Sequence, residues 1–430
     1  MIEIYEWKNT PEETKQKLMK RAQADMTEIW DYVSDWLKKV EENGDEAILE
    51  YTKKFDNPDF TIDQLRVTEE EIKEAYEKTE PKVLEMIKEQ IRISSAYHNK
   101  QAEMMEKSWE IETVPGVVTG AKKTPIDAVG LYVPAGKAPL PTVAQILTVA
   151  AKAAGVPRKV VCFAPTDNHY EIIVAANEAG ADEIYRVGGI AAIGALTYGT
   201  ESLKPVNKIA GPGNPYVQAA KLQVVDKVGI DMLSGPSEAL VIADETANPV
   251  FLASDILARC EHGPDSAGVV ITTSKEVAEK TKEEVAKQFP KLSRQEFIEK
   301  ALKQYSGIIL VDTEKEMIDF ANDYSVEHLQ IMTKDVDKTF SQIRNAGSVF
   351  IGEYAPVPVG DYASGTNHCL PTGVAPKFAS PIGVETFTKT VEFQRITKDG
   401  LKNLEPIVST ISDVEGLDAH KRAVTIRLED

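Results

Sequence analysis

The stretch AVGLYVP, residues 128–134, predicts a buried β-strand that ends in a turn. A helix rich in small residues follows at about 141–154, and strands then alternate with helices as far as residue 222. Short apolar strands joined by helical crossovers are typical of a parallel sheet that is covered on both faces. The stretch therefore predicts an α/β domain with a parallel sheet at its centre.

A second series of alternating strands and helices begins at residue 239 and ends with a strand at 348–351. The residues before about 108 carry a helical pattern, with start signals at Thr10 and Thr68 and a stop at Gly44. We therefore expect an α/β fold of two doubly wound, Rossmann-like parallel-sheet domains, a helical N-terminal segment and a small C-terminal tail domain. The expected boundaries are 1–25 for the N-terminal segment, 26–131 plus 238–381 for one α/β domain, 132–237 for the other and 382–430 for the tail.

The composition limits the classes of function. The formal net charge of −19 at pH 7 argues against nucleic-acid binding as the main activity. The three cysteines, Cys162, Cys260 and Cys369, form no paired metal or disulfide motif, which favours a reducing compartment. The N-terminus lacks the apolar core of a signal peptide, and no apolar run has the length of a membrane span. We therefore expect a cytoplasmic protein without nucleic-acid or membrane partners.

The loop after the last predicted strand carries the first candidate site residues. It contains Asp361, Asn367 and His368 within a segment rich in glycine and proline. Such a loop needs glycine and proline for its turns, but it does not need a carboxylate and an imidazole seven residues apart. The alternative is a connection whose polar side chains cap neighbouring backbone groups. We expect His98 and His169 on the surface, whereas the other histidines lie in polar motifs at the ends of apolar runs: His262, His328, His368 and His420.

Glu327 and His328 lead directly into a predicted apolar strand. Adjacent residues of a strand face opposite sides, so we expect a turn to bring both side chains into one pocket. A neutral imidazole accepts a proton near pH 7 and a carboxylate activates water, so the pair suits base catalysis. The alternative is an exposed pair at the start of a strand.

Three turns between a strand and a helix are candidates for binding a phosphate: residues 132–136, 187–189 and 211–214. In parallel α/β sheets, ligands bind where strands end and helices begin. The backbone N–H groups of a helix N-terminus suit a phosphate or pyrophosphate, as in the sequence GPGN at 211–214. None of the turns has the full GxGxxG pattern, so ordinary tight turns are the alternative.

His262, Asp361 and His420 resemble the ligand set of zinc or another divalent metal, with two nitrogens and one oxygen. They lie far apart in the sequence, so their spacing does not show whether they meet. Arg259 lies three residues before His262, and the two therefore share a face of the predicted helix. If the three ligands converge, the sequence places a guanidinium beside them.

The chain resembles the histidinol dehydrogenase family over nearly its whole length, because six motifs occur in the family's order. They are GLYVP at 130–134, GPGNPYV at 211–217, GPSEALVIAD at 235–244, EHGPDS at 261–266, EHL at 327–329 and GDYASGTNH at 360–368. The resemblance implies a homodimer of two-lobed subunits, NAD as the cofactor and usually one zinc per subunit. It also implies that an alcohol is oxidised through an aldehyde to a carboxylate with two NAD. The expected reaction is L-histidinol to L-histidine in histidine biosynthesis.

The resemblance also implies roles for individual residues. His328 resembles the general base of the hydride steps, and Glu327 resembles the group that activates water on the aldehyde. The domain at 132–237 is expected to bind NAD, with Tyr132 and Asn214 in contact with it. The tail is expected to cross to the partner subunit, so that the homodimer shares its active sites. The remaining expected positions are metal ligands at His262, Asp361 and His420, and substrate contacts at Ser237, Arg259, His262, His328, Asp361, His368, Glu415 and His420.

Three positions depart from the family's pattern. Arg259 stands where the family has a glutamine that binds zinc, Ala191 replaces a glutamine near NAD, and Val357 replaces a common glutamate. A guanidinium has no lone pair and repels a cation, so we expect weak or absent zinc. One alternative is a related enzyme in which Arg259 binds an anionic diol such as sulfopropanediol. Another alternative is a family member that binds a ligand without turnover.

Overall fold

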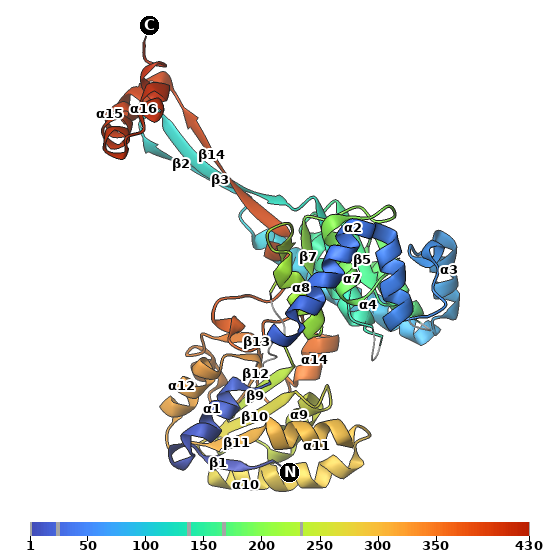
Figure 1. Cartoon of the computed structure of the whole chain (residues 1–430). Coiled ribbons are helices and arrows are strands. Elements are labelled where there is room, and N and C mark those ends of the chain that lie inside the picture. The colour runs from blue at the N-terminus through green and yellow to red at the C-terminus, as the bar shows by residue number, and fades with distance from the viewer. Residues whose placement is uncertain (1, 23–25, 136–138, 166–168, 233–234, 430) are drawn as a thin grey trace.

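The protein folds into two α/β lobes and a thin arm that projects from them (Figure 1). The structure is a computed structural model, and it describes residues 2–22, 26–135, 139–165, 169–232 and 235–429. Each lobe is built around one parallel sheet, so the expected pair of doubly wound domains is confirmed.

The first lobe contains a five-stranded parallel sheet in the order β6-β5-β4-β7-β8. Side chains on the central strand alternate, with Tyr132 facing one covering layer and Val129 and Leu131 facing the other. Both faces are therefore apolar, as a sheet covered on two sides requires. The strands are β4 (Ala128–Val133), β5 (Arg158–Phe163), β6 (Glu183–Arg186), β7 (Lys208–Ala210) and β8 (Gly229–Ile230). Helices α2 (Trp30–Phe55), α7 (Gly189–Tyr198) and α8 (Pro215–Gln223) cover one face, and α3 (Glu69–Lys78), α4 (Pro81–Met104), α5 (Pro141–Ala153) and α6 (Tyr170–Ala179) cover the other.

The second lobe contains a six-stranded parallel sheet in the order β1-β11-β10-β9-β12-β13. The strands are β1 (Ile4–Glu6), β9 (Glu238–Ala243), β10 (Ala267–Thr272), β11 (Gly307–Leu310), β12 (Val326–Met332) and β13 (Ala346–Ile351). Helices α9 (Pro249–Cys260), α10 (Lys275–Gln288) and α11 (Gln295–Gln304) cover one face, and α1 (Glu12–Lys20) and α12 (Glu314–Tyr324) cover the other. Two short helices, α13 (Val336–Phe340) and α14 (Val357–Tyr362), flank β13.

The two sheets have the same strand order once β1 is set aside. Counted along each series, the order is third, second, first, fourth, fifth in both lobes. Such a sheet has a switch point between its first and fourth strands, where the connections leave in opposite directions. The switch point falls between β4 and β7 in the first lobe and between β9 and β12 in the second.

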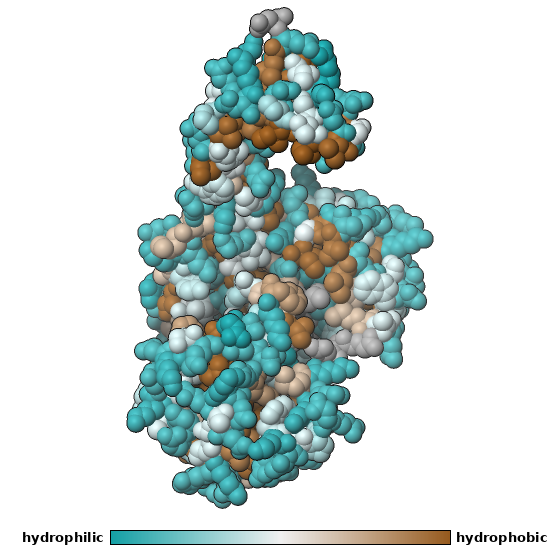
Figure 2. Space-filling view, turned by 90° about the vertical axis from the view of Figure 1, so that its left-hand side faces the viewer, coloured by the Kyte–Doolittle hydropathy of each residue, from teal (hydrophilic) through white to brown (hydrophobic). Residues whose placement is uncertain are grey.

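The arm is an antiparallel sheet of β2 (Ser108–Val114), β3 (Val117–Pro125) and β14 (Thr388–Ile396), and it ends in helices α15 (Lys398–Glu415) and α16 (Asp418–Thr425). Three apolar residues of α15, Ile407, Ile411 and Val414, are exposed and share one helical face. Figure 2 shows hydrophobic residues along the side of the arm's head that faces the body. The arm therefore leaves an apolar surface uncovered within one chain.

Several details differ from the sequence-based expectations. The segment before residue 108 is not wholly helical, because β1 pairs with β11. Gly44, at φ 50° and ψ −124°, kinks α2 rather than ending it. Helices α2 to α4 pack on the first sheet, which differs from the assignment of 26–131 to the lobe of the second sheet. The start signal at Thr68 is confirmed, where a capping box with Glu71 opens α3, but the one at Thr10 is wrong by one residue, because Pro11 is the N-cap of α1. Short 3₁₀ helices occupy Trp7–Asn9, Thr27–Ile29, Ile62–Gln64, Phe289–Lys291, Ala375–Lys377 and Val384–Phe387.

Within the part of the chain that the structure describes, no helix combines the length and the apolar character that a membrane span requires.

Candidate active site

A cavity of about 1680 Å³ lies between the two lobes. The first lobe lines it with Gly213 and Asn214, at the start of α8. The second lobe lines it with Glu238, Gly347 and Asn367, the first two at the amino ends of β9 and β13. The carboxyl edge of one sheet therefore faces the amino edge of the other across this cavity.

Glu327 and His328 lie inside β12, one and two residues after its start, and both are buried. The Oε2 atom of Glu327 accepts hydrogen bonds from the Ser237 hydroxyl at 3.1 Å and from the Glu238 N–H at 2.8 Å. It also lies 3.2 Å from Nδ1 of His328. The prediction that a turn brings the pair together is wrong, because both residues lie within the strand. The two side chains meet because the long Glu327 side chain bends around the end of the neighbouring strand β9.

The backbone fixes the orientation of the His328 ring. Nδ1 lies 3.0 Å from the carbonyl oxygen of Glu238, and a carbonyl accepts only, so Nδ1 carries the proton and donates it. The buried Nε2 atom has no hydrogen-bond partner among the described residues, although it lies 3.5 Å from the Asp361 carboxylate. Nε2 is therefore the nitrogen that faces the site with a free lone pair when the ring is neutral.

The charges around this pair shift both pKa values. Burial raises the pKa of Glu327, but the neighbouring His328 and the Arg259 charge outweigh it, and the pKa lies below its usual range. Burial and Arg259 lower the pKa of His328, but Glu327 and Asp361 outweigh them and raise it above its usual value. Glu327 is therefore ionised at neutral pH, and His328 titrates above the ordinary range of a histidine.

Arg259 lies on the last turn of α9 and its guanidinium is buried between two site residues. One terminal nitrogen donates to the Ser237 hydroxyl, and the other lies 3.4 Å from the Asp361 carboxylate. The buried Nε has no hydrogen-bond partner among the residues described. Burial raises the pKa of Asp361, but His328 and Arg259 outweigh it and hold that pKa well below its usual range.

His262 and His368 complete the cluster in the second lobe. Desolvation first, and then the positive charge of Arg259, lower the pKa of His262 to about 4, although part of the ring is open to solvent. Burial lowers the pKa of His368, and its buried Nδ1 has no partner among the described atoms. Both rings are therefore neutral at pH 7 and present lone pairs rather than charges. The cluster as a whole contains Ser237, Arg259, His262, Glu327, His328, Asp361 and His368.

The residues of one chain do not fit a zinc ion. A zinc site needs several converging lone pairs, but Asp361 is paired with the Arg259 guanidinium, which has none and repels a cation. Across the described ranges, no three His, Cys, Asp or Glu side chains are grouped so that they could hold a metal ion. We therefore assign no chemical step to zinc.

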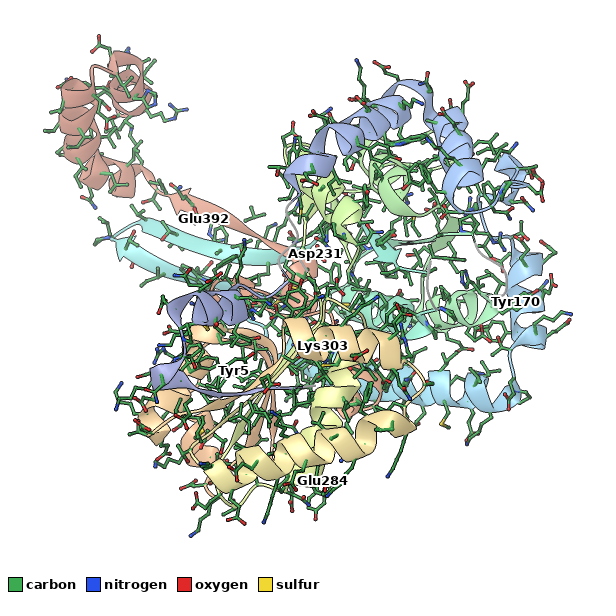
Figure 3. The ribbon with its side chains drawn as sticks, turned by 60° about the horizontal axis from the view of Figure 1, so that its bottom comes forward. Tyr5, Tyr170, Asp231, Glu284, Lys303 and Glu392 are labelled. Atoms are coloured by element: carbon green, nitrogen blue, oxygen red, sulfur yellow. The ribbon has the colours of Figure 1, made fainter. Side chains whose placement is uncertain are left out.

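The turn at 211–214 is tightly packed and borders the cavity. Gly211 has a φ of 131°, and a Cβ atom there would overlap the carbonyl oxygen of Tyr132. The Gly211 N–H donates to Asp231 at 2.8 Å, and Asp231 is paired with the fully buried Lys221. Asp231 also lines the cavity and lies between the lobes in Figure 3. This close-packed turn opens the N-terminus of α8 toward the cavity, and Asn214 caps that helix by accepting from Val217 N–H at 3.1 Å.

The other two candidate turns are less suited to binding a phosphate. At the start of α7, the Gly189 N–H donates to the Tyr132 hydroxyl at 3.2 Å, and the Ile190 N–H donates to the Tyr51 hydroxyl at 3.3 Å. These two amides are therefore occupied by tyrosines and are not free for a phosphate. The turn at 132–136 ends outside the described residues. Of the described residues in the three turns, only Gly213 and Asn214 line the cavity, so the turn at 211–214 is the candidate site for a dinucleotide.

Glu415 and His420 lie in the head of the arm, at the end of α15 and in α16 (Figure 1). Both side chains are exposed. Within one chain they do not join His262 and Asp361 in the second lobe. The sequence-based ligand set therefore does not converge inside a single subunit.

The structure also shows residues that the sequence did not point to. Glu238 lies beside Ser237. Like Glu327, it is a glutamate at the start of an apolar strand, and this shared pattern could have identified it from the sequence. Arg21, which pairs with Glu238, carries no such signal. The expectation that His98 and His169 are on the surface is wrong, because both are buried under neighbouring helices.

Comparisons with known proteins agree with this architecture. The family model described as histidinol dehydrogenase matches residues 19–428. The chain is 43% identical over 417 residues to a histidinol dehydrogenase of Methanothermobacter thermautotrophicus, covering 96% of this chain and 97% of the relative. It is 44% identical over 425 residues to that of Methanocaldococcus jannaschii, covering 98% of each. A crystal structure of histidinol dehydrogenase from Elizabethkingia anophelis superposes with a TM-score of 0.92 at 36% identity, covering 99% of this chain and 98% of that one. The chain therefore belongs to the histidinol dehydrogenase family of oxidoreductases.

Proposed function

We propose that this protein oxidises L-histidinol to L-histidine with NAD, taking a primary alcohol through the aldehyde to the carboxylate. The observation that carries the proposal is the buried pair of Glu327 and His328, held side by side next to Glu238, which lines the cavity between the lobes. The relatives in the same family are named for this activity, which supports the same substrate. The balanced reaction converts one alcohol, one water and two NAD⁺ into one carboxylate, two NADH and three protons.

The site residues divide the chemistry between them. Nε2 of His328 takes the alcohol proton, because Nδ1 is committed to the Glu238 carbonyl. Glu327 then activates the water that adds to the aldehyde, since its pKa is low and Ser237 holds its carboxylate in place. His328 takes a proton again from the hydrated aldehyde. When bound, NAD accepts the hydride that leaves the substrate carbon in each of the two oxidations.

The cofactor is assigned to the first lobe, at Tyr132, Asn214 and the amides that open α8. The substrate is assigned to the second lobe, where Ser237, His262, Asp361 and His368 surround the catalytic pair. Support for this division comes from the cavity, which Asn214 lines from the first lobe and Glu238, the neighbour of Ser237, lines from the second.

We also assign a homodimer with shared sites, in which Glu415 and His420 of the partner subunit reach this cavity. The support is the uncovered apolar face of α15, at Ile407, Ile411 and Val414. Met104 and Phe378, which are exposed and line the cavity, offer a matching apolar surface on the body. An apolar stripe of this kind is stabilised when a second copy covers it.

The first experiment measures NADH formation and histidine formation with L-histidinol and with the aldehyde. Glu327→Gln should leave hydride transfer from the alcohol largely intact and slow the oxidation of the aldehyde by about 10²-fold or more. Equal rates of acid formation in the parent and in Glu327→Gln would remove the role assigned to Glu327. A parent protein that binds NAD but does not oxidise L-histidinol would contradict the proposed reaction.

The shared site has its own test. His328→Asn and Glu415→Gln homodimers should each be nearly inactive, but mixed dimers contain one site with both native residues. Random mixing makes half of the dimers mixed, so about a quarter of the parent activity should return. No recovery, in a mixture shown to exchange subunits, would contradict the shared site.

A second candidate reaction is the oxidation of an anionic diol, such as a sulfonated one. The observation that favours it is the buried Arg259 guanidinium, whose Nε has no partner among the described residues and which already orients Ser237. A guanidinium of this kind binds carboxylates and sulfonates through paired hydrogen bonds. Measuring kcat/KM for L-histidinol and for carboxylated and sulfonated diols decides between the two, and Arg259→Gln should abolish only the activity on anionic diols.

A further inference from the structure

The chain crosses between the two lobes at three places. The first crossing joins α1 of the second lobe to α2 of the first, and the second joins β8 to β9. The third leads from α14 back to the first lobe, where Cys369 and Ile382 are buried in its core. All three crossings meet at one buried side chain, the carboxylate of Glu238.

Arg21 and Glu238 form a buried ion pair at this meeting point. The Arg21 guanidinium lies 2.6 Å from Glu238 Oε2 and donates to the Tyr324 carbonyl at 2.9 Å. It also stacks over the Tyr324 ring, at 4.2 Å from the ring centroid. From the third crossing, the Gly373 N–H donates to Glu238 Oε1 at 3.1 Å. The side chain of Glu238 is thus held from two separate chain segments.

The backbone of Glu238 is what orients the catalytic pair. Its N–H donates to Glu327 at 2.8 Å, and its carbonyl accepts from His328 Nδ1 at 3.0 Å. A shift of this one peptide would therefore move the carboxylate of Glu327 and the ring of His328 together. Arg21 adopts a φ of 56°, which is rare for a residue other than glycine and persists only when the surroundings impose it.

We infer that Arg21 and Glu238 are positioning residues, which clamp the three crossings between the lobes and thereby hold Glu327 and His328 in their reactive arrangement. The inference rests on the proposed function of that catalytic pair. Both side chains of the clamp are buried, and they act on the catalytic pair through the backbone of Glu238. The effect of the clamp is on the geometry of the pair, and small displacements of reacting groups cost large factors in rate.

A buried ion pair of this kind is poorly explained by stability alone. Replacing both charges by neutral groups of similar size is often neutral for stability, whereas removing one charge leaves the other buried and unpaired. The double variant Arg21→Met with Glu238→Gln therefore separates the two explanations. Burial raises the pKa of Glu238 to about 7, although Arg21 opposes this, so the comparison is made at about pH 8.5, where the carboxylate is ionised.

The experiment compares the thermal midpoint, kcat and KM of the parent, both single variants and the double variant, with L-histidinol and NAD. A positioning role predicts that the double variant regains the thermal midpoint of the parent while kcat stays at least about tenfold lower and both KM values stay within about twofold. Arg21→Lys keeps the positive charge but lacks the paired N–H donors of a guanidinium, so it should give an intermediate kcat. Recovery of kcat together with the midpoint would overturn the inference.

A matched control is the Arg158–Glu183 pair at the amino ends of β5 and β6, away from the cavity. Its nitrogen and oxygen lie 2.6 Å apart, as in the clamp. Arg158→Met with Glu183→Gln should change neither kcat nor KM by more than about twofold. If this pair lowered kcat as much as the clamp does, the effect would be general and the inference would fail.

A readout without turnover keeps this result separate from the proposed function. In protein labelled at histidine nitrogens, the Nδ1–H proton of His328 is identified as the signal lost in His328→Asn. In the double clamp variant that proton should exchange with water at least about tenfold faster, because its acceptor has moved. Unchanged exchange would overturn the inference even if the parent did not oxidise L-histidinol.

Discussion

The two lobes share one strand order but use opposite ends of it. In the first lobe the candidate cofactor groups lie at the carboxyl ends of β4 and β7, at Tyr132 and the Gly211 turn. In the second lobe the reactive groups lie at the amino ends of β9 and β12, at Ser237, Glu327 and His328. The same pair of strands therefore frames a candidate site in each lobe, but from opposite edges of the sheet.

The difference teaches how each site is made. The first is made mostly of backbone amides and tight turns, which the sheet topology supplies at its carboxyl edge. The second is made of charged side chains, which can be placed at either end of a strand. They lie at the edge of the sheet that faces the other lobe. A backbone site should be most sensitive to steric changes, and a side-chain site to changes of charge and proton affinity.

The largest expected effect is in the second lobe, at His328. His328→Asn keeps an N–H near the Glu238 carbonyl but removes the Nε2 base, so kcat should fall by about 10³-fold. The measurement is NADH formation at saturating substrate, with thermal unfolding as the control for folding. A loss of less than about tenfold would mean that the base lies elsewhere.

The next effect is in the first lobe, at Gly211. Gly211→Ala forces a side chain into a φ of 131° and against the Tyr132 carbonyl, so the turn must move. The KM for NAD should rise about tenfold or more while kcat changes far less. The matched control is Gly155→Ala, since Gly155 also has a positive φ, 82°, but its added Cβ meets nothing within 4 Å. An equal rise in the KM for NAD in both variants would mean that backbone strain alone, and not the clash with the Tyr132 carbonyl, causes the effect.

A third prediction concerns the pH profile. The Asp361 carboxylate raises the pKa of His328, and a base works only after it has lost its proton. In the parent, activity should therefore rise with pH through a pKa above the usual histidine value. Asp361→Asn should move this acid limb to lower pH, measured as kcat/KM against pH. A limb that stays in place or moves upward would contradict the assignment of His328 as the base.

The sequence was sufficient for part of the site. Alternating apolar strands and helices predicted both sheets, and the polar motifs together with the family resemblance pointed to seven residues that the fold brings together: Ser237, Arg259, His262, Glu327, His328, Asp361 and His368. It could not show which sheet edge they occupy, because that depends on how the two lobes are stacked. A rule about a single sheet contains no information on this stacking.

Other features were hidden for local reasons. His98 lies among largely polar neighbours on α4, yet its ring turns inward and bonds the Ser94 carbonyl one helical turn earlier, at 2.8 Å. The arm joins β3 with β14, whose residues are separated by more than half of the chain, and β14 is largely polar. Pairing over such a distance leaves no periodic signal within either segment.

The smallest predicted effect is on stability, at Asp56 in the first lobe. Burial raises the pKa of Asp56 to about 6, and one buried oxygen has no partner among the described residues. The folded state therefore holds the proton more tightly, so stability falls as pH rises from about 4 to about 6 and the loss is complete above that. Because the group is partly exposed, Asp56→Asn should stabilise by only about 1 kcal/mol at pH 8, and by nothing below about pH 4. Denaturant unfolding at both pH values measures this, and an equal gain at both would contradict it.

The pairing of β1 with β11 has a consequence during synthesis. Ile4 lies opposite Ile308, and Ile2 is fully buried in the finished lobe. At roughly 5–20 residues per second, the ribosome needs on the order of 15 to 60 seconds to deliver the partner strand. Strand β1 is thus synthesised long before its partner β11, and the nascent chain has to keep this apolar strand from other partners until its own sheet exists.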